Sequence, residues 1–163
     1  VGELMKLLSW ALNKETLELD KNNVRLSAIG RLEALPDAVR RELEGAILRL
    51  QDNTGLNLVL ALNYGGRQEI LDAANKAIAA GAKSLDEDTI AENLYTAELP
   101  ELDLMIRTSG EMRISNFLLW QVAYAELHVT PVLWPDFRKE HLVAALEDYQ
   151  KRDRRFGGLS AKP

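Results

Sequence analysis

The feature that most constrains the fold is a regular alternation of helix-like and strand-like segments. Apolar residues recur every three or four positions, as in amphipathic helices, over residues 4–21, 36–54 and 68–80. Strand-like runs follow at residues 24–29, 56–62 and 102–107. The run at 56–62 is mostly apolar on both faces, as expected for a strand covered on both sides. This order favours parallel strands joined by right-handed crossovers, so we expect an α/β fold with a mostly parallel central sheet flanked by helices.

The second half of the chain continues the same alternation with weaker signals. It predicts a short acidic helix, a second helix, a last strand interrupted by Pro131 and a final helix, at residues 86–94, 117–125, 127–134 and 139–154. No linker, repeat or low-complexity tract separates these elements, so we expect one domain over residues 1–163. The chain begins with Val1 and enters helical periodicity at once, so we expect a further segment, with a strand or two, before it.

Composition narrows the class of protein. The net charge of −5 argues against nucleic acid as the main partner. No run of about eighteen apolar residues is present, so nothing in the sequence predicts a membrane span. The chain has no cysteine, which excludes disulfides and thiolate metal sites. These features fit a cytoplasmic location, which we expect.

The densest chemical signal lies at residues 103–120. Ligands of parallel α/β sheets bind beyond the carboxyl ends of the strands, and Arg107 stands at such an end. A glycine-containing loop, Arg113, Ser115 and an expected helix start follow it. Guanidinium groups, a hydroxyl and main-chain N–H groups together suit a diphosphate. The alternative is that the two arginines pair with Glu111 or Asp103 and that Ser115 only caps a helix.

The sequence around this loop resembles cis-prenyltransferases, specifically bacterial undecaprenyl diphosphate synthases. The segments that carry the resemblance are IRTSGE at 106–111, RISNFLLWQ at 113–121, AYAEL at 123–127, LWPDF at 133–137, NYGGR at 63–67 and RRFGG at 154–158. The resemblance implies a homodimeric enzyme that requires Mg²⁺ and condenses isopentenyl diphosphate units, with cis double bonds, onto farnesyl diphosphate. Its long polyprenyl (undecaprenyl) diphosphate product is the lipid carrier precursor of bacterial cell-wall synthesis, and peripheral membrane contact could accompany product release.

The resemblance also assigns residues. Arg107, Arg113 and Ser115, with the main chain of Ile114, match the positions that hold the diphosphate of isopentenyl diphosphate. Glu126 matches a magnesium-binding glutamate, although by sequence alone it reads as a solvated helix-end carboxylate. The catalytic residue is expected to be an aspartate in a Gly-Asn-Gly-Arg context that does not occur in this chain. We therefore expect it before Val1, and we expect the 163 residues alone to be inactive.

The resemblance further implies an apolar product tunnel. Leu4, Leu7, Leu8 and residues 56–62 would line it, with Leu56 as a candidate for its floor, although plain core is the simpler interpretation for most of them. Residues 154–158 would pack over a dimer partner's active site, whereas composition alone suggests that the basic stretch 151–155 is a solvated helix end.

Two other functions stay open at this point. A non-catalytic subunit of a heteromeric cis-prenyltransferase would explain the absent aspartate, and a generic phosphate-binding α/β module would explain the arginine loop. His128 and His141 show no metal-ligand spacing. The Gly65-Gly66 pair is not a phosphate-binding P-loop, because no Gly-Lys-Ser/Thr follows it.

Overall fold

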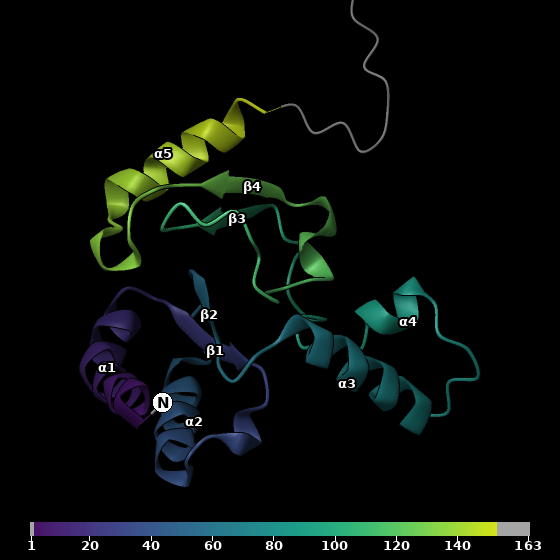
Figure 1. The fold of residues 1–163 in the computed structure, drawn as a ribbon. Helices are drawn as coiled ribbons and strands as arrows, with labels where there is room; N and C mark the ends of the chain where they lie inside the picture. Colours follow the sequence, from purple (N-terminus) through teal and green to yellow (C-terminus); the bar gives the residue numbers. More distant parts are fainter. Residues whose placement is uncertain (1, 153–163) are drawn as a thin grey trace, which may run out of the picture. The chain divides into compact units, whose positions relative to one another are not determined.

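The computed structural model describes residues 2–152, and Figure 1 shows their helices and strands. The chain divides into two compact units, Val1–Ala97 and Glu98–Pro163, which are described separately below. Each unit contains a pair of parallel strands with helices packed against it. The predicted α/β class with parallel strands is therefore confirmed, while the expectation of one domain over residues 1–163 stays a prediction.

The first unit is built around the parallel strands β1 and β2. Its elements are α1 (Gly2–Lys21), β1 (Arg25–Ile29), the 3₁₀ helix η1 (Leu32–Ala34), α2 (Asp37–Leu50), β2 (Asn57–Ala61), α3 (Gly66–Ala79) and α4 (Glu87–Ala91). The strands pair in register from Arg25 opposite Asn57 to Ile29 opposite Ala61. Helices α1 and α2 lie against each other (Figure 1). The core between these elements consists of Leu12, Leu26, Leu35, Leu43, Ala46 and Leu50.

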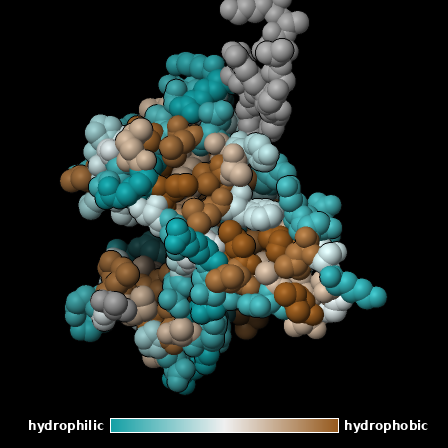
Figure 2. Space-filling view, turned by 45° about the vertical axis from the view of Figure 1, so that its right-hand side comes forward, coloured by the Kyte–Doolittle hydropathy of each residue, from teal (hydrophilic) through white to brown (hydrophobic). Residues whose placement is uncertain are grey.

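The side chains expected to line a product tunnel have different environments. Leu8 packs against the core of the first unit, as do Leu58, Leu60 and Leu62 of the expected tunnel-wall strand. The side chains of Leu4, Leu7 and Leu56 are instead more than half exposed. Figure 2 shows that hydrophobic residues, drawn in brown, also reach the surface elsewhere on the chain. The tunnel itself stays a prediction.

The second unit contains β3 (Leu104–Arg107) and β4 (Glu126–Val129), which are also parallel. Helix α5 (Lys139–Gln150) lies along β4 in Figure 1 and packs against it. Two 3₁₀ helices, η2 (Gln121–Tyr124) and η3 (Trp134–Asp136), flank β4 along the chain. The carboxyl end of β3 leads into the long loop that holds the predicted diphosphate-binding residues.

The predicted helix at 117–125 is wrong. Turns occupy its first half, and only η2 is helical. Three residues before and within it have left-handed backbone conformations, Ser115 at φ 50°, Asn116 at φ 65° and Leu118 at φ 47°. An α-helix of L-residues cannot contain such conformations, so the segment turns repeatedly instead.

The predicted ends of the last two elements also need correction. Strand β4 ends at Val129, before Pro131, whose missing N–H cannot extend a ladder. Helix α5 ends at Gln150 rather than near residue 154. Residues 154–158, which the resemblance assigns to a dimer contact, lie outside the described residues. Among residues 2–152, no helix is both long and apolar enough to cross a membrane.

Candidate diphosphate-binding site

Arg107, at the carboxyl end of β3, lines a cavity of about 260 Å³ that runs beside the whole strand. The other residues that line the cavity are apolar, namely Leu102, Leu104, Met105, Ile106, Ile114, Phe117 and Leu118. The Nε atom of Arg107 is buried and has no hydrogen-bond partner, and its guanidinium makes no ion pair within residues 2–152. A buried N–H without an acceptor costs about 1–3 kcal/mol, more when the group is charged. The cavity is therefore lined, among residues 2–152, by one cationic residue and otherwise apolar ones, and that cationic residue has a buried N–H whose hydrogen-bonding capacity is unused.

The loop beyond Arg107 has a fixed but unusual backbone. The N–H of Ser109 donates to the carbonyl of Val132 at 2.8 Å, and the N–H of Gly110 donates to that of Thr130 at 2.9 Å. Ser109 is also left-handed, with φ at 66°. Left-handed non-glycine residues cost free energy and cluster at ligand-binding sites, so four of them between residues 109 and 118 mark this loop as a candidate functional segment.

The structure brings only part of the predicted site together. Arg107 and Ile114 line the same cavity. Arg113 instead pairs with Glu111, with 2.5 Å between Nη1 and Oε2, and its side chain is 70% exposed. This ion pair is the alternative that the sequence left open. To contact a ligand, Arg113 must either break the ion pair with Glu111 or use other N–H groups of its guanidinium. Ser115 caps no helix, because no helix starts there.

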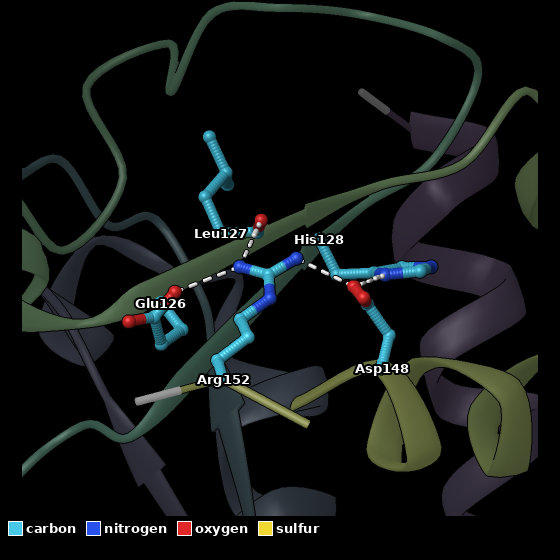
Figure 3. Close-up of polar contacts among 5 residues, drawn as sticks. All are labelled: Glu126, Leu127, His128, Asp148 and Arg152. Atoms are coloured by element: carbon cyan, nitrogen blue, oxygen red, sulfur yellow. Dashed lines mark hydrogen bonds and ion pairs between the residues drawn. The ribbon is translucent and has the colours of Figure 1, made fainter. Parts of the chain in front are cut away.

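Glu126, the predicted magnesium ligand, begins β4 rather than ending a helix. Its Oε2 accepts a hydrogen bond from Nη1 of Arg152 at 2.7 Å, and the same Nη1 donates to the carbonyl of Leu127 at 3.0 Å (Figure 3). The other nitrogen, Nη2, lies 2.5 Å from Oδ2 of Asp148, which in turn lies 2.8 Å from Nδ1 of His128. We call Glu126, His128, Asp148 and Arg152 the Arg152 cluster.

The charges of the Arg152 cluster stabilise one another. The Glu126 and Asp148 carboxylates raise the pKa of Arg152 above its usual value. His128 and Arg152, by their hydrogen bonds, lower the pKa of Asp148. Two carboxylates, those of Glu126 and Asp148, thus share the one guanidinium of Arg152.

Glu126 alone fits one ligand position of a magnesium ion. Mg²⁺ usually takes one or two carboxylates and completes its shell with water and phosphate oxygens. Within the described part of the chain, no three His, Cys, Asp or Glu side chains form a group that could hold a metal. In the β3–β4 register, Glu126 lies opposite Leu104, which is three residues before Arg107. The backbones of Glu126 and Arg107 are therefore offset by roughly 10 Å along the strand direction.

A second polar network surrounds the NYGGR segment at the end of β2, in the first unit. Asp72 accepts hydrogen bonds from Arg31, at 3.0 Å and 2.7 Å, and from the hydroxyl of Tyr95. The Arg31 guanidinium holds the pKa of Asp72 well below its usual range. Burial of the Tyr95 hydroxyl, and secondly its hydrogen bond to Asp72, raise the pKa of Tyr95 to about 12. The fully buried Glu69 accepts from the hydroxyl of Tyr64 and, at 3.0 Å, from the N–H of Tyr95.

Sequence reasoning missed the Arg152 cluster. It interpreted the stretch 151–155 as a solvated helix end and gave His128 no role. Asp148 and Arg152 are four residues apart, a spacing that favours a helix ion pair, and that signal was available. The contact with Glu126 joins residues 26 positions apart, so it required the packing of α5 on β4.

A sequence profile described as "Putative undecaprenyl diphosphate synthase" matches residues 1–157. An isoprenyl transferase of Heliobacterium mobile is 50% identical over 165 residues, covering 98% of this chain and 64% of the relative. An isoprenyl transferase of Neisseria gonorrhoeae is also 50% identical, with the same coverage. The chain thus spans somewhat less than two thirds of the length of these relatives.

Solved structures agree with the sequence comparisons. Lavandulyl diphosphate synthase from Lavandula x intermedia, solved with dimethylallyl diphosphate, superposes with a TM-score of 0.87 and 37% identity over 94% of this chain and 70% of that one. A probable undecaprenyl diphosphate synthase from Campylobacter jejuni gives a TM-score of 0.83 and 37% identity over 93% and 72%. The arginine loop at the end of β3 thus lies in a fold shared with prenyl diphosphate synthases, and the chain belongs to the undecaprenyl diphosphate synthase family.

Proposed function

We propose that the protein containing these residues is an isoprenyl transferase that condenses isopentenyl diphosphate onto farnesyl diphosphate to give a long cis-polyprenyl diphosphate. The observation that carries the proposal is Arg107, the one charged residue of the described chain that lines an otherwise apolar cavity, whose buried Nε has no hydrogen-bond partner. An ordinary inorganic anion would use the arginine alone. A five-carbon diphosphate would use the arginine for its charge and the apolar walls for its hydrocarbon part.

The loop residues have distinct parts in this proposal. Arg107 binds the diphosphate from within the cavity, and Ile114 contributes its main chain beside it. Arg113 and Ser115 bind the diphosphate from outside the cavity. To do so, Arg113 breaks its ion pair with Glu111 and pairs with the diphosphate. Exchange of one exposed ion pair for a charge-assisted contact with a diphosphate is favourable, because exposed pairs contribute only about 0–1 kcal/mol.

Among the described residues, Glu126 is the proposed magnesium ligand, and Arg152 contacts its Oε2 rather than its Oε1. When bound, the ion would neutralise diphosphate charge and so help the leaving group depart. We place the second carboxylate and the catalytic aspartate before Val1, in line with the resemblance. Homodimer formation, a cytoplasmic location, peripheral membrane contact and a product that serves cell-wall synthesis also belong to the proposal.

The direct test is a product analysis. The full-length protein is incubated with farnesyl diphosphate, isopentenyl diphosphate and Mg²⁺, and its products are separated by length. The proposal expects a ladder that ends in long polyprenyl diphosphates. Products with no added unit, or only one, would contradict it, and activity only after addition of a second polypeptide would favour the non-catalytic subunit.

A further inference from the structure

Arg152 connects two elements of the second unit, β4 and α5, through one side chain. Its guanidinium donates to the side chain of Glu126, to the carbonyl of Leu127 and to Asp148 (Figure 3). The first two belong to β4 and the third to α5. A planar guanidinium fixes the relative directions of its N–H groups, so three acceptors held at once leave it little rotational freedom.

The consequence for Glu126 is a fixed carboxylate with one oxygen still available. Arg152 contacts Oε2, and no hydrogen bond to Oε1 is found within residues 2–152. Both side chains are about 30% exposed, so Oε1 can meet an ion from solvent.

We propose that Arg152 is a positioning residue for the metal-binding step: it orients Glu126 so that Oε1 can bind a divalent cation. The inference rests on the proposed function, because it takes Glu126 as a magnesium ligand. Groups that hydrogen-bond to metal ligands orient them, and their loss typically costs about 10–100-fold in metal affinity. Asp148 serves Arg152 in turn, as the anchor of its second nitrogen.

The effect of Arg152 on the orientation of Glu126 can be separated from the effect of its charge, because the two predict opposite changes in cation affinity when Arg152 is replaced. Loss of a positive charge beside a carboxylate, by Coulomb's law, strengthens cation binding. Weaker binding in Arg152→Met would therefore report lost orientation. Arg152→Lys keeps the charge but lacks the planar fork, so it should also weaken binding, with no change in local charge to account for the loss.

The experiment measures metal binding rather than activity. Mn²⁺, which accepts the same oxygen ligands, is titrated into full-length protein saturated with isopentenyl diphosphate, and the free ion is followed by electron paramagnetic resonance, with protein-free blanks. Arg152→Met should raise the Kd by about 10–100-fold. Arg138→Met is the matched control, because Arg138 borders the other end of α5 and its side chain donates to the carbonyls of Pro135 and Phe137. It should leave the Kd unchanged.

A double mutant decides whether Arg152 acts through Glu126. Glu126→Gln should weaken Mn²⁺ binding, and adding Arg152→Met to it should weaken binding no further. Additive losses, or unchanged or tighter binding in Arg152→Met alone, would overturn the inference. Unchanged binding in Glu126→Gln would overturn both the inference and the metal role of Glu126. The product analysis reports separately on the proposed reaction, so the failures are distinguishable.

Discussion

Replacement of Arg107 by methionine should have opposite effects on stability and on ligand binding. Methionine is similarly long and apolar, so it fills the same space without a buried donor that lacks an acceptor. Removing that donor should raise the free energy of unfolding of the ligand-free protein by about 1–3 kcal/mol. The same change removes charge-assisted bonds to a diphosphate worth about 1.5–3 kcal/mol, so isopentenyl diphosphate should bind roughly 10- to 150-fold more weakly.

Urea unfolding without ligand measures the first effect, and calorimetric titration of isopentenyl diphosphate measures the second. Arg113→Met is the matched control, because Arg113 is exposed and paired with Glu111. It should weaken the ligand but change stability by no more than about 0.5 kcal/mol. Farnesyl diphosphate should bind both variants nearly as it binds the parent. A clear loss of stability in Arg107→Met, or equal losses for both substrates, would refute the reasoning.

Two further predictions concern the first unit. Because Arg31 lowers the folded-state pKa of Asp72 below its unfolded value of about 3.9, the resulting stabilisation is present above pH 4 and is lost as the pH falls. Asp72→Asn should therefore show a shallower loss of unfolding free energy between pH 4 and pH 2, and a slope equal to the parent's would contradict this. Gly30→Ala should destabilise by about 2 kcal/mol or more, because φ is +112° and the new Cβ would lie 2.0 Å from the carbonyl oxygen of Leu62. The control Gly45→Ala, within α2 and with open space around it, should instead stabilise by about 0.5–1 kcal/mol, and thermal unfolding of both variants decides.

Strong periodicity made most of the fold predictable. The apolar face of α1, the run that forms β2 and the strand that delivers Arg107 were each placed within about two residues of their observed bounds. The helix expected at 117–125 failed for a physical reason. Its sequence has apolar helix formers, but residues with left-handed backbone conformations, such as Asn116 and Leu118, interrupt it. The spacing of apolar residues does not reveal such backbone angles.

The candidate site was predictable where it depended on chain position. Arg107 is the last residue of a strand, so its place at the ligand-binding end could be inferred from order alone. The pairing of Arg113 with Glu111 is local and was foreseen as an alternative. The contact between Arg152 and Glu126 was not, because it arises when α5 packs on β4 and depends on which turn of the helix meets the strand.

The most direct test of the central claim is a crystal structure of the full-length protein with isopentenyl diphosphate and no allylic substrate, so that no reaction occurs. The account predicts that a diphosphate oxygen lies about 2.7–3.0 Å from a guanidinium nitrogen of Arg107, with the hydrocarbon part against the apolar walls of the same cavity. A diphosphate bound elsewhere, with the guanidinium of Arg107 making no contact to it, would contradict the account.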